Sequence, residues 1–276
     1  MPELPDLEIY RENLQPLVIG KQIASVSILY PKTMQLISEE DFIRAVSGAT
    51  LTSIRRLGKR LLFGLDTGEG CGWMAVHLMM YGEIRYGIDV SSAVKGLRVC
   101  LRFTSGDELV FLDMSAWTKI GYYSEDGSIG QGMQRRLAML GHEPLDADLT
   151  PEVLRRLFAG ETKTVKECLM DHKLIIGIGN AYSDEILWQA GIAPMRQAAS
   201  LSPEGLHGLR SAMQTVLVEA IDKVRIGLQG QTYGEVRDFL HVHSRPKKKQ
   251  CDRCGGLIER VEIKTRGSYF CPRCQK

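Results

Sequence analysis

The first 125 or so residues alternate between hydrophobic and polar positions in a way typical of β-strands. The pattern is clearest in the segment LRVCLRF, whose hydrophobic residues share one face: Leu97, Val99, Leu101 and Phe103. Further strand candidates lie at 22–30, 50–56, 60–65, 73–78 and 109–113. A helix precedes them, which Asp6 can cap and which we expect to run to about Gln15. Several short strands after one helix predict a β-sandwich.

Helical patterns dominate from about 131 to 226. Thr150-Pro151 and Ser202-Pro203 each place a capping hydroxyl before a proline, which suits the first position of a helix. Between them, a glycine-rich turn leads through Asn180 into a helix predicted over 182–190. Such a turn presents free N–H groups to an anion, although a packing corner between two helices has the same pattern.

The composition is that of an ordinary globular protein, with 44% hydrophobic and 25% charged residues in a chain of 276. This length suits one large domain or two to three small ones. The sequence has no hydrophobic run long enough to span a bilayer, and its N-terminus lacks the basic and apolar segments of a secretory signal. We therefore expect a cytoplasmic protein without a membrane partner.

Positive charge is concentrated at the C-terminal end. Residues 245–276 contain ten Lys and Arg against three Asp and Glu, a net charge of +7, so the rest of the +2 chain carries −5. A cationic segment on a mildly acidic body favours a polyanion as partner, although a solvated basic terminus is an equally open interpretation. The segment 226–250, first Gly-rich and then basic, is predicted to be a linker.

Four of the seven cysteines form two CxxC pairs, CDRC and CPRC, separated by 16 residues: Cys251, Cys254, Cys271 and Cys274. Each pair can place two thiolates on one side of a tight turn, and two such turns complete a tetrahedral zinc site. Disulfides are the alternative, which a reducing cytosol disfavours. A closed site of four thiolates leaves no position for substrate, so one structural Zn²⁺ is expected.

The residues between the two pairs predict a β-hairpin that turns near 265–267. Hydrophobic residues flank the turn on both sides: Ile258, Val261, Ile263, Tyr269 and Phe270. Arg266 is then expected at an exposed tip, which the metal holds rigid. A guanidinium at a fixed tip suits a phosphate.

Several stretches resemble the formamidopyrimidine-DNA glycosylase/endonuclease VIII family. They are MPELPDLE at the N-terminus, HLMMYG, GHEPL, VKECLMDHKL, IGIGNAYSDEIL and the closing CDRCGG…TRGSYFCPRCQK, in the same order and over nearly the whole chain. Leu4 in PELP resembles the residue found at this position in the formamidopyrimidine-DNA glycosylase branch, whereas the endonuclease VIII branch usually has glycine there.

The resemblance implies an α+β multidomain fold with three parts. Residues 1–130 would form an N-terminal β-sandwich catalytic domain with an opening helix. Residues 131–244 would form a helix–two-turns–helix DNA-binding domain, and residues 245–276 a zinc-finger β-hairpin. Double-stranded damaged DNA is the implied partner, and a monomer the implied state.

The resemblance also gives the N-terminal sequence a chemical role. Removal of Met1 is expected before proline, and Pro2 then carries a free secondary amine that attacks C1′ of the damaged nucleotide and displaces the base. An α-amine has a lower pKa than a lysine side chain, so more of it is unprotonated at neutral pH. The resulting iminium, a Schiff base, acidifies the C2′ proton, and elimination of the 3′ phosphate follows. Glu3 is the expected proton carrier, and Lys59 matches a hairpin lysine beside the lesion.

Five further residues match DNA contacts of the family. His77, Asn180 and Arg266 match phosphate contacts. Met80 and Trp117 match two residues that fill the space left by an extruded base. Taken singly, such residues also have ordinary interpretations, for example a core histidine or a solvated surface charge.

Two segments depart from the family pattern. The stretch DMSAWT stands where a motif like DPRRFG is expected, and Ser115 takes the place of an arginine that contacts the orphaned partner base. The lesion-covering region at 227–250 is altered as well. Within it, His241 and His243 alternate with hydrophobic residues, which predicts one face of a strand rather than metal ligands.

The resemblance therefore predicts a bifunctional DNA glycosylase/AP lyase of base-excision repair that removes oxidised purines, 8-oxoguanine and formamidopyrimidines. A damaged-DNA-binding protein with weak catalysis is one alternative, and a glycosylase for other oxidised bases such as pyrimidines is another. A zinc-finger transcription regulator is disfavoured, because one finger beside PELP offers no element that reads a base sequence.

Overall fold

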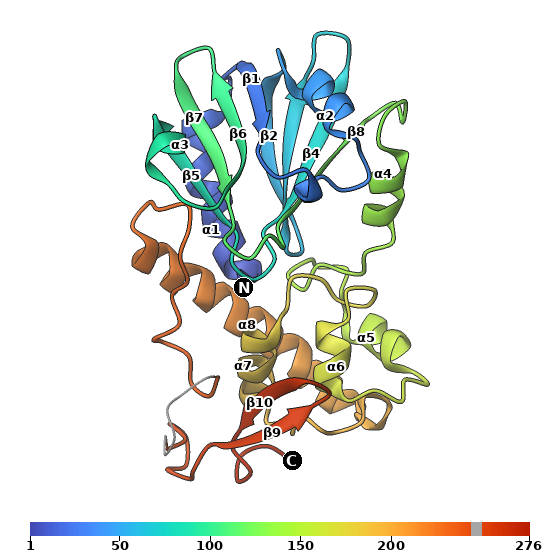
Figure 1. Cartoon of the computed structure of the whole chain (residues 1–276). Helices are drawn as coiled ribbons and strands as arrows, with labels where there is room; N and C mark the ends of the chain where they lie inside the picture. Colours follow the sequence, from blue (N-terminus) through green and yellow to red (C-terminus); the bar gives the residue numbers. More distant parts are fainter. Residues whose placement is uncertain (244–249) are drawn as a thin grey trace. The chain divides into compact units, whose positions relative to one another are not determined.

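The computed structural model of the chain describes residues 1–243 and 250–276. It divides into two compact units, Met1–Met139 with Val224–Glu235, and Leu140–Lys223 with Val236–Lys276. Figure 1 labels most of the elements of both. The basic residues of 244–249, and the predicted domain boundary at 244/245, lie outside the described residues. Within the described ranges, no helix has both the length and the hydrophobicity to cross a membrane.

The first unit contains two four-stranded antiparallel sheets (Figure 1). One has the order β1-β6-β7-β5, that is Ile23–Ile28, Leu97–Phe103, Asp107–Leu112 and Glu83–Ile88. The other has the order β2-β3-β4-β8, that is Thr50–Leu57, Arg60–Asp66, Cys71–His77 and Lys119–Ser124. Phe63 of β3 meets Phe111 of β7 edge to face, with ring centroids 6.1 Å apart. The two sheets thus share a core, and the predicted β-sandwich is confirmed.

The hydrophobic pattern located most strands and missed two. Strand β6 begins and ends at the predicted residues, whereas β5 (EIRYGI) and β8 (KIGYYS) were not predicted. Both are set by their neighbours, since β5 pairs with β7 and β8 with β4. In β4, Gly72 leaves room for the ring of Tyr122 from β8. A Cβ there would lie 2.1 Å from the Tyr122 hydroxyl, so a larger residue would force the ring out of this position.

Helix α1 (Leu4–Val18) starts earlier than predicted. Its N-cap is Glu3 and not Asp6. Asp6 lies in the first turn and accepts a hydrogen bond of 2.8 Å from the backbone N–H of Glu3. A carboxylate that accepts from the N-cap amide forms half of a capping box. The sequence thus correctly indicated that Asp6 stabilises the start of the helix, but it placed the N-cap three residues too late. The other helices of this unit are η1 (Pro31–Thr33), α2 (Glu39–Val46), α3 (Val90–Ala93) and α4 (Gln131–Ala138).

The segment after the last long helix belongs to the first unit and is fastened to it at several points. The Tyr10 hydroxyl donates a hydrogen bond to the Gly234 carbonyl. The Asn13 side-chain amide donates to the Gln231 carbonyl at 2.8 Å. The Thr232 hydroxyl donates to the carbonyl of Ile84 in β5 at 2.6 Å. Part of the region that departs from the family is therefore held against α1 and β5.

The second unit is helical and carries the C-terminal hairpin. Its helices are α5 (Pro151–Phe158), α6 (Val165–Met170), α7 (Asn180–Ala190), η2 (Ala198–Ser200) and α8 (Pro203–Leu228), whose last residues from Val224 count with the first unit. The Thr150 hydroxyl accepts a hydrogen bond of 3.3 Å from the amide of Val153, and the Ser202 hydroxyl accepts one of 3.2 Å from Gly205. Both predicted caps are confirmed.

The hairpin consists of β9 (Glu259–Ile263) and β10 (Arg266–Phe270). Lys264 and Thr265 make the turn, and Lys264 adopts φ of 54°. Arg266 pairs with Ile263 as the first residue of β10, so it flanks the turn that was predicted to contain it. Its side chain is exposed, as expected for a phosphate contact.

No strand forms at His241 and His243, and that prediction is wrong. The backbone N–H groups of residues 241, 242 and 243 donate to the carboxylate of Glu185 at 2.7, 2.8 and 2.8 Å. Amides used by one carboxylate are not available for a strand ladder. The alternation still has a cause, because Leu240 and Val242 are buried.

Candidate functional site

The start of α1 fixes the first two candidate catalytic residues. Pro2 is buried, and Glu3 is 3% exposed. The hydrogen bond from the Glu3 amide to Asp6 holds the backbone at this point. Asp6 is itself fully buried, so it positions Glu3 from inside the fold.

Lys59 lies at the turn between β2 and β3 and is 5% exposed. The same hairpin is tied to α1, because Arg56 Nε donates to Glu8 at 2.9 Å and Arg56 Nη1 donates to the Gly58 carbonyl at 3.2 Å. An ion pair of the helix thus anchors the hairpin that carries Lys59.

Met80 and Trp117 lie on two turns that the structure joins. His77 ends β4 opposite Lys119 of β8, and Met80 follows in the next turn. The hydroxyl of Thr118 lies 3.2 Å from the Leu78 carbonyl and 2.9 Å from Asp113, and its one hydrogen is shared between these two acceptors, which links that turn to the one with Trp117. Met80 is 44% exposed and Trp117 55%. The two side chains are therefore available on adjacent turns, as a wedge would require.

Asp113 organises the turn that departs from the family. One carboxylate oxygen accepts from the backbone and hydroxyl of Ser115, at 2.7 and 2.6 Å. The other accepts from the amide of Trp117 at 2.8 Å and from the amide and hydroxyl of Thr118 at 2.7 and 2.9 Å. Burial raises the pKa of Asp113, but these donors outweigh it, and the pKa lies below its usual value.

In the second unit, Asn180 and Arg266 are brought together. Asn180 is the first residue of α7, and its side-chain N–H donates to the carbonyl of Gly267 at 3.0 Å. Gly267 directly follows Arg266 in β10. Two candidate phosphate contacts that lie 86 positions apart in the sequence are thus neighbours in the fold.

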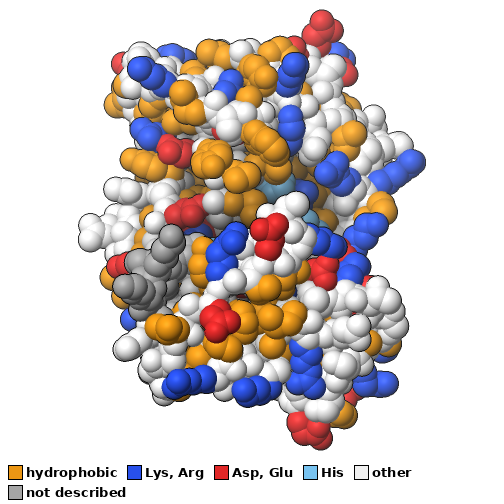
Figure 2. Space-filling model, turned by 60° about the horizontal axis from the view of Figure 1, so that its bottom comes forward, with side chains coloured by type: hydrophobic (Ala, Val, Ile, Leu, Met, Phe, Trp, Pro, Cys, Tyr) orange, Lys and Arg blue, Asp and Glu red, His pale blue; other side chains and the backbone are white. Residues whose placement is uncertain are grey.

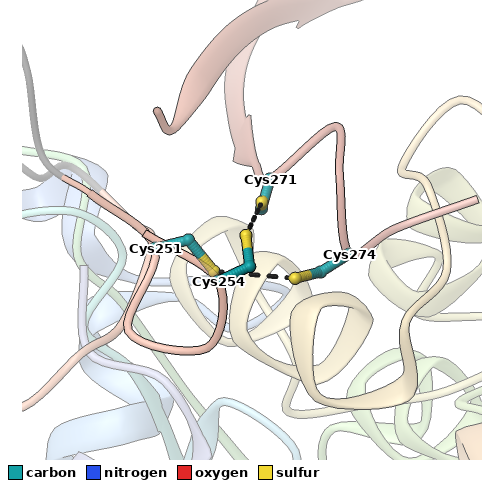
Figure 3. Close-up of side chains that lie close together, drawn as sticks. All are labelled: Cys251, Cys254, Cys271 and Cys274. Atoms are coloured by element: carbon teal, nitrogen blue, oxygen red, sulfur yellow. Dashed lines mark hydrogen bonds between the residues drawn. The ribbon is translucent and has the colours of Figure 1, made fainter. Parts of the chain in front are cut away.

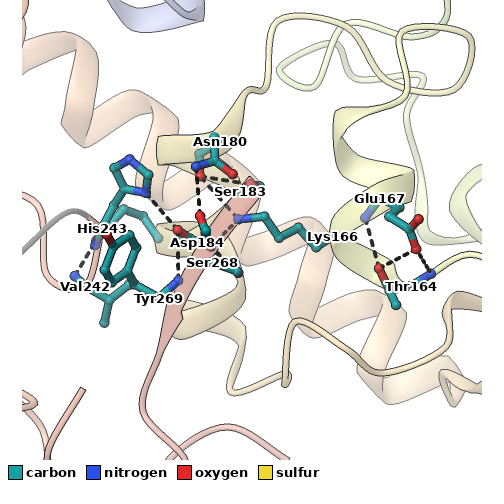
Figure 4. A network of polar contacts seen from close by, with 12 residues as sticks. Thr164, Lys166, Glu167, Asn180, Ser183, Asp184, Val242, His243, Ser268 and Tyr269 are labelled. Atoms are coloured by element: carbon teal, nitrogen blue, oxygen red, sulfur yellow. Dashed lines mark hydrogen bonds and ion pairs between the residues drawn. The ribbon is translucent and has the colours of Figure 1, made fainter. Parts of the chain in front are cut away.

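A buried charged network lies behind this pair (Figure 4). Asp184 of α7 and Lys166 of α6, each 1% exposed, form an ion pair. Asp184 also accepts from the Ser268 hydroxyl at 2.7 Å and the Tyr269 amide at 3.2 Å, and it bonds His243 Nδ1 at 2.7 Å. A buried ion pair needs such additional partners. The network fixes β10, and with it Arg266, against α7.

The four cysteines meet in one cluster (Figure 3). Their sulfur atoms all lie within 4.8 Å of one another, with 3.8 Å between Cys251 and Cys274 and 3.5 Å between Cys254 and Cys271. A tetrahedral site with Zn–S bonds of about 2.3 Å requires sulfur atoms about 3.8 Å apart. All four are free thiols. The cluster therefore fits one structural Zn²⁺ and not the disulfide alternative.

Cys251 has a distinctive environment within this cluster. Burial raises the pKa of its thiol, but the indole N–H of Trp188 and the backbone amides of Arg253 and Cys254 outweigh burial and lower the pKa to about 6. The thiolate is the form that binds zinc. Hydrogen bonds from the indole and the two amides thus stabilise the thiolate form of Cys251.

Sequence reasoning missed three residues that organise these sites, namely Asp113, Asp184 and Trp188. Asp113 is shared by DMSAWT and the expected motif like DPRRFG, but no role followed from that, because its partners are amides and hydroxyls of its own turn. Asp184 and Trp188 follow Asn180 at intervals of four residues. That spacing places all three on one face of α7 and could have indicated a shared docking role.

Charge alone does not delimit a DNA-binding surface here. On the face shown in Figure 2, Lys and Arg side chains are spread among hydrophobic and acidic ones. Several Lys and Arg side chains also form ion pairs within the protein, such as Lys264, which pairs with Glu167 at 2.8 Å. The individual residues and their geometry therefore carry the functional argument.

Three family models match the chain in succession. Residues 1–120 match the formamidopyrimidine-DNA glycosylase N-terminal domain, residues 140–232 its H2TH domain, and residues 248–276 a zinc finger found in FPG and IleRS. Together these matches span most of the chain. They define a zinc-finger DNA glycosylase of the repair type.

Proteins similar over their whole length support the same assignment. The formamidopyrimidine-DNA glycosylase of Shouchella clausii is 36% identical, with 100% of this chain and 99% of the relative covered. The structure of Lactococcus lactis FPG bound to Fapy-dG DNA has a TM-score of 0.88 at 28% identity and covers 99% of this chain and 100% of its own. The complex of that enzyme with abasic-site DNA has a TM-score of 0.87 at 27% identity, with 99% of each chain covered. The present chain belongs to the formamidopyrimidine-DNA glycosylase family.

Proposed function

We propose that this protein is a bifunctional DNA glycosylase/AP lyase that removes oxidised purines through a Schiff base on Pro2. One observation carries the proposal. Pro2 and Glu3 stand at the buried start of α1, in a chain that matches, over 99% of its length, an enzyme crystallised with Fapy-dG DNA. The protein would act in base-excision repair once Met1 has been removed, which frees the Pro2 nitrogen.

The chemistry follows from a secondary amine. The nitrogen lone pair forms a bond to C1′, and the bond from C1′ to the damaged base breaks with its electron pair on the base. Glu3, adjacent to the nucleophile, supplies a proton to the sugar oxygen or the leaving base. Once the nitrogen has lost its N–H proton, its lone pair forms the second bond to C1′, and the ring bond from C1′ to O4′ breaks with its electron pair on O4′, which takes a proton. The product is an iminium, which must be cationic because the nitrogen has no second proton to lose. That charge acidifies C2′–H, and the 3′ phosphate leaves.

The remaining candidate residues would hold the DNA in position. Lys59, His77, Asn180 and Arg266 are proposed to contact phosphates around the lesion. Asn180 can do so and keep its present bond, because its side-chain NH2 group has two N–H donors and the bond to the Gly267 carbonyl uses one of them. Met80 and Trp117 would fill the space of the extruded base.

Borohydride trapping tests the proposal. Wild-type protein should form a covalent complex with duplexes that contain an abasic site or 8-oxoguanine opposite cytosine, and its intact mass should lack Met1. Pro2→Gly should lose strand cleavage and keep DNA binding. Pro16→Ala, which changes an exposed proline of the same helix, is the control and should cleave normally.

A second variant distinguishes the role of the Pro2 amine from that of the Pro2 side chain. An uncleavable N-terminal extension leaves Pro2 intact but converts its nitrogen to an amide, which cannot attack. Normal cleavage by the extended protein would refute the amine mechanism, whereas normal cleavage by Pro2→Gly would show that a primary α-amine at this position suffices. A wild-type protein that lacks Met1, binds DNA and never traps would instead favour the alternative of a binding protein with weak catalysis.

Oxidised pyrimidines are a second candidate substrate class. A structure of Lactococcus lactis FPG bound to DNA with an oxidised pyrimidine has a TM-score of 0.87 with this chain at 28% identity. Trapping on the abasic duplex without trapping on 8-oxoguanine would direct the search to these bases. The monomeric state and the three domain boundaries stay proposals, which size-exclusion chromatography with light scattering and limited proteolysis would test.

A further inference from the structure

Helix α7 holds the C-terminal finger through three residues on one face. Asn180 contacts Gly267, and Asp184 contacts Ser268 and Tyr269, so both act on the hairpin. Trp188, one turn further along, donates its indole N–H to the sulfur of Cys251 at 3.3 Å. Of these three residues, Trp188 is the one whose side chain reaches a predicted zinc ligand.

We propose that Trp188 is a functional part of the zinc centre, which retains the metal through its hydrogen bond to the Cys251 thiolate. Four thiolates around one Zn²⁺ leave a net negative charge on the sulfur atoms. An N–H donor stabilises that charge and orients the ligand, and loss of such a partner typically costs about 10–100-fold in metal affinity. Trp188 is 5% exposed, so water does not compete freely for the bond.

Residues of the first CxxC turn contact Trp188 directly and through His241. Arg253, inside this turn, lies over the ring at 4.0 Å and donates to the Trp188 carbonyl at 2.7 Å. Asp252, the other intervening residue, bonds Nδ1 of His241 at 2.7 Å. The His241 ring in turn stacks on Trp188, with centroids 4.4 Å apart and an interplanar angle of 19°. The conformation of the CDRC turn that places Cys251 and Cys254 for zinc therefore also makes these contacts with Trp188.

This arrangement couples the metal to the DNA-contacting end of α7. Asn180 and Trp188 are eight residues apart on one rigid helix, about 12 Å along its axis. Metal loss would release the turn that surrounds Trp188 and so loosen the finger at one of its anchors. The inference concerns metal retention and does not depend on the chemistry of Pro2.

Zinc release measures the proposed bond directly. Full-length zinc-loaded protein is mixed with excess chromophoric chelator, and the release rate is followed by absorbance. Trp188→Phe keeps a ring and removes the N–H donor, and we expect release about tenfold faster. Trp73→Phe is the matched control, because it also removes an indole hydrogen bond, to Glu125 at 2.9 Å, in the other unit. Equal rates for wild type and Trp188→Phe would overturn the proposal.

Cobalt substitution separates the hydrogen bond from simple packing. In protein loaded with Co²⁺, a thiolate without its donor is a better electron donor, so the thiolate-to-cobalt absorption band of Trp188→Phe should move to longer wavelength. Loss of packing alone would not move this band. An unshifted band would therefore also overturn the proposal.

A third measurement leaves Trp188 unchanged and works even where Trp188→Phe does not fold. The chain has three tryptophans, so Trp73→Phe with Trp117→Phe leaves Trp188 as the sole one. Its fluorescence should change in step with metal loss during a chelator titration. Emission that is insensitive to complete removal of zinc would show that the indole does not sense the metal.

Discussion

The hydroxyl of Ser115 donates a hydrogen bond of 2.6 Å to the carboxylate of Asp113 and so points back into its own turn. Ser115 occupies the position where the family resemblance places an arginine. Its only side-chain donor is engaged, and the exposed neighbours Met114 and Trp117 offer hydrophobic surface. This turn can stack on bases, but it presents little that could read the edge of an orphaned partner base.

Ser115→Arg should sharpen the preference for the base opposite the lesion. A guanidinium that bonds a base edge discriminates by about 1–3 kcal/mol, so we expect about a tenfold separation among the four opposite bases. The measurement is single-turnover excision on four duplexes that differ only at that base. Met114→Arg adds the same charge at the neighbouring position and should change the excision rate equally on all four duplexes. If Ser115→Arg also does so, the position does not face the partner base.

Asp113→Asn should destabilise the first unit at neutral pH and not in acid. The carboxylate of Asp113 has two acceptor oxygens for its donors, and the amide of asparagine has only one. Buried donors left without an acceptor lower the free energy of unfolding by about 1–3 kcal/mol. Because the folded state lowers the pKa of Asp113, its contribution is present above the usual carboxyl pKa and is lost as pH falls through the lower folded value. The difference in the free energy of unfolding between Asp113→Asn and wild type should therefore shrink as the pH falls below the usual carboxyl pKa of 3.8.

Denaturant unfolding across this pH range checks the prediction. Asp126→Asn is the control, since Asp126 also accepts from a nearby serine, Ser128, but is exposed. At neutral pH, Asp126→Asn should lower the free energy of unfolding by less than Asp113→Asn does. A pH-independent gap for Asp113→Asn would mean that the ionised carboxylate is not what stabilises the turn.

Arg266→Ala should remove about one phosphate contact. The slope of log binding constant against log salt concentration should fall by about 1, with weaker binding on every duplex sequence alike. Lys264→Ala makes the same charge change two residues away, but Lys264 is paired with Glu167 and should leave the slope nearly unchanged. Fluorescence anisotropy at several salt concentrations gives both slopes. Equal slopes for the two variants would argue that Arg266 does not bind a phosphate.

The periodic parts of the fold were predictable from sequence. The alternation in β6 and the serine or threonine caps of α5 and α8 are local, so the residues that define them are adjacent in the chain. Strands β5 and β8 were missed, because partners distant in sequence set their conformation. The strand predicted at His241 failed for a related reason, since one distant carboxylate, that of Glu185, takes its backbone amides.

The candidate site divides in the same way. The zinc ligands follow from two short spacings, and the structure brings them together. The spacing of Asp184 and Trp188 could indicate a shared face of α7, but not their partners on the finger, which lie 59 to 85 residues away in the sequence. Pro2 and Arg266 rest on family resemblance, because neither a proline nor an exposed arginine has a distinctive spacing.

Cys254→Ser should release zinc and weaken DNA binding together. Cys254 is an exposed ligand, and loss of one of four thiolates opens a site whose metal binding contributes directly to folding of the finger. Since α7 and β10 share the contacts that place Arg266 beside Asn180, a loosened finger should reduce affinity for all duplexes. Metal analysis and anisotropy measure the two effects, with Cys71→Ser, an exposed thiol of the first unit, as the control. Zinc loss with unchanged DNA affinity would mean that the finger lies outside the DNA-binding surface, and the proposed role of Arg266 would fail with it.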